Sequence, residues 1–181
     1  MEWVRGKNAK KSSSAAIKML ERLLTSGFDK DVSLGLINST ISLNCKEDMF
    51  STIDIGIMDL VKGNIEFIKN GAAPSYIKKG RKVEIIKSIS LPAGILDNID
   101  LVVYDKDIDD GDIIVMCSDG IIESNQEYNN KEIWLKDVLE NIETDNVQKI
   151  ADIVISEAID NGYGVAKDDM TIFVIKVNRI K

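Results

Sequence analysis

Histidine is absent from this chain of 181 residues, and cysteine is nearly absent, with two. The lack of histidine excludes Ser-His-Asp and Cys-His nucleophile chemistry, and it excludes zinc sites built on histidine. The two cysteines, Cys45 and Cys117, match no metal-binding spacing and are too few for a disulfide framework. Any hydrolytic chemistry must therefore rest on carboxylates, lysines or a metal ion held by oxygen ligands.

Basic residues and long apolar runs are also scarce. The 23 Lys and Arg residues against 30 Asp and Glu give a net charge of −7, which predicts no nucleic-acid binding. No apolar run approaches the ~20 residues of a membrane helix, and the N-terminus lacks the layout of a signal peptide. We therefore expect a cytoplasmic segment that makes no membrane contact. Its length is sufficient for a single domain over residues 1–181.

The spacing of apolar residues predicts an α+β protein. Apolar residues recur at helical spacing in two early segments and two late ones, and they alternate or run continuously in the segments between. We predict helices over residues 12–26, 32–43, 131–141 and 146–161, and strands over 51–57, 64–69, 75–78, 82–87, 101–104, 112–117 and 170–177. The last strand is almost entirely Ile, Val and Phe, which is typical of a central strand.

Carboxylates stand at the ends of two very apolar strands. Asp119 follows residues 112–118 directly, and Gly120 after it permits an abrupt turn with close backbone approach. Asp168 and Asp169 stand immediately before the last strand. Adjacent carboxylates repel each other and resist burial, and a cation such as Mg²⁺ or Mn²⁺ would relieve that cost. The alternative is that these acids are ordinary turn residues that face water.

Five segments in this order resemble the phosphatase domain of stage II sporulation protein E and its relatives. These proteins belong to the metal-dependent, type 2C-like (PPM) protein serine/threonine phosphatases. The matching segments are MFSTID (49–54), NGAAPSYI (70–77), LPAGI (91–95), MCSDGI (116–121) and DDMT (168–171). The resemblance begins at about residue 6 and extends to the C-terminus.

The resemblance implies a fold, a cofactor and roles for individual residues. The fold is an α-β-β-α sandwich of antiparallel sheets, and the cofactor is a pair of Mn²⁺ or Mg²⁺ ions. Asp119 and Asp168 match catalytic aspartates that bind metal, and we place Gly120 and Asp169 beside these ligands rather than among them. Asp54 either supports the site or only the fold, and we favour the fold.

The N-terminus departs from the family. Members carry Asp-Gly-Met-Gly-x-Gly before the first long helix, and its first aspartate bridges both metal ions. Here that place holds Met1 to Gly6, and the strands expected before it are missing, so we expect one metal site to be incomplete. Asp-Gly-Met-Gly-Thr-Gly can be encoded as GAT GGA ATG GGT ACG GGG. Read one base later, this DNA begins with ATG and encodes Met-Glu-Trp-Val-Arg-Gly, the sequence of residues 1–6. A frameshift is therefore one hypothesis, and the other is an unrelated leader or a boundary set within a longer protein.

Two functions remain open. The first is hydrolysis of phosphoserine on a regulatory protein such as an anti-sigma factor antagonist, in sporulation or stress control of sigma factors. We expect this chain to be impaired in it. The second is a catalytically inactive fragment that binds proteins or forms a homodimer. The early helices either act as a switch, as they can in this family, or simply pack in the core. The intact parent could be anchored to a membrane through an upstream region.

Overall fold

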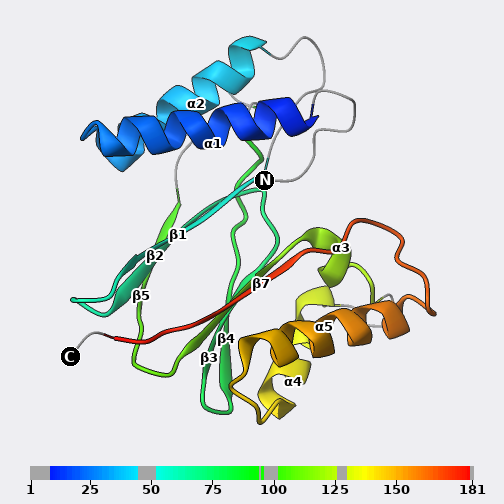
Figure 1. Cartoon of the computed structure of the whole chain (residues 1–181). Coiled ribbons are helices and arrows are strands. Elements are labelled where there is room, and N and C mark those ends of the chain that lie inside the picture. The colour runs from blue at the N-terminus through cyan, green and yellow to red at the C-terminus, as the bar shows by residue number, and fades with distance from the viewer. Residues whose placement is uncertain (1–8, 45–51, 94, 96–101, 126–129, 180–181) are drawn as a thin grey trace. The chain divides into compact units, whose positions relative to one another are not determined.

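The computed structural model describes residues 9–44, 52–93, 95, 102–125 and 130–179 (Figure 1). Its elements, in chain order, are α1 (Ala9–Thr25), α2 (Lys30–Asn44), β1 (Ile53–Asp59), β2 (Asn64–Asn70), β3 (Ser75–Lys79), β4 (Lys82–Ile86), β5 (Val103–Asp107), β6 (Ile113–Cys117), α3 (Asp119–Ile122), α4 (Lys131–Asn141), α5 (Val147–Asn161) and β7 (Ile172–Lys176). The predicted α+β class is confirmed. None of the described helices has the length and apolar character needed to cross a membrane.

The described strands form two sheets, with strand orders β1-β2-β5 and β4-β3-β6-β7. In the four-stranded sheet, β3 pairs with β4 and β6, and β6 pairs with β7, all antiparallel. β7 therefore lies at the edge of the sheet as described, and the prediction that it is a central strand is wrong there. The apolar sequence of β7 reflects cover on both faces of the sheet, since Val174 packs against one core and Ile175 against the other. Such cover does not require a second neighbouring strand.

By its internal contacts the chain divides into two compact units. Unit 1 comprises Met1–Ile55, Ile68–Ala72 and Ser88–Val103, and unit 2 comprises Gly56–Phe67, Ala73–Lys87 and Tyr104–Lys181. We describe each unit by itself. The prediction of a single domain over residues 1–181 stays a prediction.

In unit 2, the four-stranded sheet has an apolar core on each face. Along β6 the side chains alternate: Ile113 and Val115 belong to one core, and Ile114 belongs to the other. The first core is closed by buried residues of α4 and α5, among them Leu135, Leu139, Ile150, Val154 and Ala158. The second is closed by residues of β2 and of the segment after β5, among them Ile65, Phe67 and Ile108. Because both faces are covered, β6 needs apolar residues at successive positions, as its sequence shows.

A buried lysine links this sheet to a helix end. Lys78 on β3 is 5% exposed, and its Nζ donates a hydrogen bond of 2.7 Å to the carbonyl oxygen of Leu139. Leu139 lies in the last turn of α4, where carbonyl groups lack partners within the helix. Burial lowers the pKa of Lys78, since it disfavours the ammonium form.

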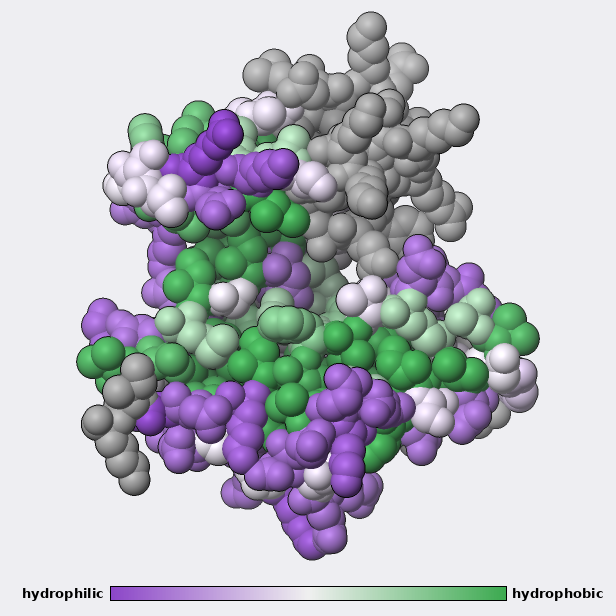
Figure 2. All heavy atoms as spheres, in the orientation of Figure 1, coloured by the Kyte–Doolittle hydropathy of each residue, from purple (hydrophilic) through white to green (hydrophobic). Residues whose placement is uncertain are grey.

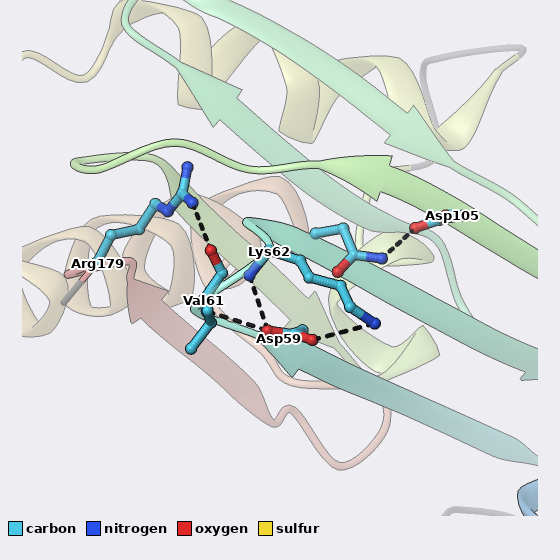
Figure 3. Close-up of polar contacts among 6 residues, drawn as sticks. Asp59, Val61, Lys62, Asp105 and Arg179 are labelled. Carbon is cyan, nitrogen blue, oxygen red and sulfur yellow. Dashed lines mark hydrogen bonds and ion pairs between the residues drawn. The ribbon is translucent and has the colours of Figure 1, made fainter. Parts of the chain in front are cut away.

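The turn between β1 and β2, also in unit 2, is fixed by Asp59 and Arg179 (Figure 3). Asp59 Oδ1 accepts hydrogen bonds from the backbone N–H of Lys62 at 2.9 Å and of Val61 at 3.0 Å. The bond from Lys62 is the main reason that the pKa of Asp59 lies below its usual value. Arg179 donates to the carbonyl oxygen of Val61 at 2.9 Å, so the C-terminal segment is tied to this turn.

In unit 1, α1 ends at Thr25, one residue before the end of the predicted helix over residues 12–26, and Gly27 terminates it. Gly27 has φ +85°, and the N–H groups of Gly27 and Phe28 bond to the carbonyl oxygens of Leu24 and Leu23. This is the Schellman arrangement, for which glycine is favoured because positive φ costs it little. The helical spacing is confirmed, but the apolar residues are not uniformly buried, because Ile17 and Leu24 are exposed.

Candidate metal centre

Asp119 is positioned by the end of β6. The strand runs from Ile113 to Cys117, Ser118 has extended backbone angles, and Asp119 is the first residue of the four-residue helix α3. Gly120, Ile121 and Ile122 are buried, so this short helix is anchored in the core of unit 2. The Asp119 side chain is half-buried at the point where the chain reverses from strand to helix.

The segment that carries Asp168 is joined to the segment after β6. The register of β6 and β7 pairs Cys117 with Ile172, which brings the residues just beyond these two into contact. Ser118 accepts and donates here: its Oγ donates to the carbonyl oxygen of Asp169 at 3.0 Å and accepts from the N–H of Thr171 at 2.9 Å. A backbone bond of 2.9 Å, from the N–H of Ser118 to the carbonyl oxygen of Thr171, completes the connection.

Gly120 permits this close approach. A Cβ atom added at Gly120 would lie 2.3 Å from the carbonyl oxygen of Asp169 and 3.1 Å from its carbonyl carbon. Both are backbone atoms, which cannot move aside as the end of a flexible side chain could. Any residue other than glycine would therefore push residues 168–171 away from Asp119.

We expect Gly120→Ala to destabilise the protein by about 1–3 kcal/mol, because overpacking against backbone forces a local shift. Gly35→Ala is the matched control: nothing lies within 4 Å of the position of its Cβ. Gly35 lies inside α2, so alanine there should stabilise by about 0.5–1 kcal/mol. Urea unfolding of both variants measures the difference. An equal effect of the two substitutions would contradict the close approach at Gly120.

The chemistry of these donors fits a hard divalent cation. Asp119 is half-buried, while Asp168 and Asp169 are exposed, and all three offer carboxylate oxygens of the kind that Mg²⁺ and Mn²⁺ prefer. The N–H of Asp169 donates to Asp168 Oδ1 at 2.8 Å, which orients the Asp168 carboxylate. Nowhere in the described part of the chain do three or more acidic, cysteine or histidine side chains cluster as a metal site would. The carboxylates of Asp119 and Asp168 are the described groups that could hold such a cation.

The structure brings all four predicted site residues onto two adjoining segments. Asp119 and Gly120 lie on one, and Asp168 and Asp169 on the other. Their roles as ligands and neighbours stay predictions. Sequence reasoning did not single out Ser118, whose hydroxyl joins the segments, although a serine between a buried strand and Asp-Gly was the available signal.

Asp54 lies in unit 1, on β1, and forms a buried ion pair. Lys69 Nζ lies 2.6 Å from Asp54 Oδ2, with the lysine side chain fully buried and the aspartate side chain 16% exposed. The carbonyl oxygen of Lys69 accepts hydrogen bonds from the hydroxyls of Ser88 and Ser90. These contacts give Asp54 a part in the interior of unit 1, and whether it also supports the site stays open.

Asn70, next to this pair, is fully buried, and neither its amide nitrogen nor its carbonyl oxygen has a hydrogen-bond partner among the described residues. We expect Asn70→Leu, of similar shape, to stabilise the protein by about 1–3 kcal/mol, since the cost of the unsatisfied amide disappears. Thermal and urea unfolding measure the change. A loss of stability would contradict this prediction and would indicate that the amide has a partner, such as an ordered water.

Several sequence features fall outside the described residues. They are Met1 to Gly6, to which the frameshift hypothesis applies, Cys45, residues 49–51 of the first matching segment, and Gly94 of the third. The remaining residues of the five segments are described.

Comparison with known proteins identifies the family. The sequence profile of "Stage II sporulation protein E (SpoIIE)" matches residues 5–178. The Stage II sporulation protein E of Bacillus subtilis (strain 168) is 35% identical over 173 residues, which cover 96% of this chain and 21% of the relative. That of Priestia megaterium is 34% identical over 172 residues, covering 95% of this chain and 29% of the relative. The chain thus spans between a fifth and a third of the length of these relatives.

Solved structures show the same relationship. A structure of the PP2C phosphatase domain and a fragment of the regulatory domain of SpoIIE from B. subtilis aligns with a TM-score of 0.86 at 35% identity, covering 97% of this chain and 52% of that one. The phosphatase domain of the same protein, presoaked with manganese, aligns with a TM-score of 0.70 at 30% identity, covering 100% and 78%. The architecture with antiparallel sheets is therefore that of the PP2C phosphatases. The chain belongs to the Stage II sporulation protein E family.

Proposed function

We propose that this chain is the greater part of a metal-dependent protein serine/threonine phosphatase domain. The substrate class is a phosphoserine on a regulatory protein such as an anti-sigma factor antagonist, in sigma-factor control. The observation that carries the proposal is the junction of the strand ends at Ser118, which puts Asp119 and Asp168 on adjoining segments. A relative 35% identical to this chain is described as a PP2C phosphatase domain.

In this proposal each residue has a physical task. Asp119 and Asp168 hold Mn²⁺ or Mg²⁺ through carboxylate oxygens, and a hydrogen bond from the N–H of Asp169 orients Asp168. Ser118 holds the two segments together, and Gly120 lets them approach. When bound, the metal supplies Lewis-acid activation of water and of the phosphoryl group. A chain without histidine can then carry out hydrolysis at neutral pH.

The chain by itself should turn over slowly. The sequence contains no Asp-Gly-Met-Gly segment, and the described residues lack a cluster of three ligands. A second metal ion would have few ligands here, so we propose that one of two sites is incomplete. This observation also favours the second candidate function, an inactive fragment that binds proteins or forms a homodimer.

Hydrolysis of a phosphoserine protein separates the two functions. Purified chain is incubated with a phosphorylated anti-sigma factor antagonist at saturating Mn²⁺, and released phosphate is measured. Slow release that stops on chelation of the metal supports the phosphatase. Binding of the phosphoprotein without any release at saturating Mn²⁺ supports the inactive module.

We further propose a cytoplasmic location for the segment, because sigma factors and their regulators act where transcription occurs. Its acidic balance agrees with a protein partner rather than a nucleic acid. An upstream region of the longer parent would supply any membrane anchor.

A further inference from the structure

A groove lies between α4 and α5 in unit 2, and none of the residues of the candidate metal centre lines it. One side is formed by Lys149, Ile153, Glu157 and Asn161 of α5, which repeat every four residues along a single face. The other side is formed by Trp134, Asp137, Val138 and Asn141 of α4, also at helical spacing. The hollow has a volume of about 870 Å³. From Lys149 to Asn161 it follows α5 for about 18 Å, the length of roughly three helical turns.

The groove has apolar surface at its centre. Ile153 is 37% exposed and flanks the face of α5 on which Ile150, Val154 and Ala158 are buried. Val138 is half-buried on the α4 side of the groove. The indole N–H of Trp134 donates to the carbonyl oxygen of Ile122 at 3.1 Å, so its polar atom needs no further partner. Figure 2 shows hydrophilic side chains gathered over α4 and α5, with a broad hydrophobic band beside them. Ile153 and Val138 therefore supply the accessible apolar surface of the groove, between the polar side chains that line it.

The rims are acidic. Of the acidic residues that line the groove, Glu143 is already paired with Arg81 at 2.7 Å. Asp137 and Glu157 have no ion-pair partner in the described part of the chain, and Lys149 is the one basic residue in the lining. The potential of the groove is therefore negative near Asp137 and Glu157, and a basic partner would be attracted there.

We propose that this groove binds an amphipathic helix of a partner protein, with an apolar stripe flanked by lysines or arginines. The stripe packs on Val138 and Ile153, and the basic side chains reach Asp137 and Glu157. Two helix faces with a hollow between them accept the ridge of a third helix, as in other helix-in-groove complexes. A second copy of this chain is a poorer occupant, because each copy has a net charge of −7 and copies repel.

The probe is a labelled synthetic helix of about 14 residues, built from leucine on one face and lysine on the other. Fluorescence anisotropy measures its binding to the whole chain. The double variant Asp137→Lys/Glu157→Lys should weaken binding by about tenfold or more. The control Asp152→Lys/Asp160→Lys changes the net charge equally, at exposed positions of α5 outside the groove, and should weaken binding less than about threefold. Circular dichroism verifies that all variants fold.

Ile153→Ser tests the apolar contact and should also weaken binding of the leucine/lysine helix. Equal weakening by the groove variant and the control variant would overturn the proposal, since the attraction would then come from net charge alone. Equal binding of a leucine/glutamate helix would overturn the charge assignment. Sedimentation of the chain alone tests the other occupant: a dimer that Ile153→Ser dissociates would assign the groove to a second copy and overturn the proposal of a partner protein.

Discussion

Asp119→Asn should weaken Mn²⁺ binding by about 100-fold or more and abolish phosphoserine hydrolysis. Asparagine preserves the size of the side chain but removes the negative charge that a divalent cation requires from its ligand. Mutation of groups that only orient the ligands typically lowers metal affinity by about 10- to 100-fold, so loss of a ligand should lower the affinity at least as much. Electron paramagnetic resonance of free Mn²⁺ measures the affinity directly.

The matched control for this prediction is Asp152→Asn, which removes the same charge from an exposed position on α5. It should leave Mn²⁺ affinity unchanged within about twofold, because exposed charges are strongly screened at ordinary ionic strength. If the two variants lowered the affinity equally, Asp119 would be one surface acid among many, and the metal assignment would fail.

Lys69→Met should destabilise the protein by about 3–5 kcal/mol. The fully buried Lys69 lies 2.6 Å from Asp54, whose carboxylate is mostly buried. Methionine keeps most of the volume but leaves that carboxylate without its cation in a poorly solvated environment. Urea unfolding at neutral pH measures the loss, and Asp54→Asn/Lys69→Met should recover part of it because the uncompensated charge is gone.

Lys62→Met gives the comparison for an exposed pair. Lys62 Nζ lies 3.6 Å from Asp59 Oδ2, and the lysine side chain is 79% exposed. Its removal should lower the free energy of unfolding by less than about 1 kcal/mol. A loss at Lys69 no greater than the loss at Lys62 would show that the buried pair does not stabilise the fold.

The periodicity of the sequence predicted most elements, for identifiable reasons. Helix α5 buries Ile150, Val154 and Ala158 at intervals of four residues, and the predicted and observed helix both end at Asn161. The continuous apolar run of β6 predicted a strand, and the structure explains that run because both faces of β6 are buried. In both elements the local pattern and the tertiary environment agree, so the pattern was sufficient.

Features that depend on contacts between distant parts of the chain could not be predicted from the sequence. The helix α3 has only four residues, too few to show a period. β7 has the composition of a central strand but has one neighbour in the described sheet, and composition cannot reveal that number. Ile17 on α1 fits the apolar spacing and is nevertheless 57% exposed. Spacing defines a face, and only the fold decides what covers it.

The sequence likewise predicted some features of the candidate site and not others. Two acidic segments at strand ends were visible in the sequence, and the pairing of β6 with β7 makes them neighbours. The hydroxyl of Ser118 and the contact of Gly120 with Asp169 depend on that pairing, so only the structure could show them. The ion pair of Asp54 with Lys69 likewise joins two strands whose register the sequence did not determine.

We propose that the junction of β6 and β7 holds a divalent cation between Asp119 and Asp168. Anomalous diffraction at the manganese edge, from crystals of this chain soaked in Mn²⁺, locates the ion directly. We predict a peak within about 2.0–2.6 Å of a carboxylate oxygen of each residue, the range for hard cations on oxygen ligands. A peak that contacts neither carboxylate, or the absence of any peak at this junction in saturating Mn²⁺, would contradict the claim.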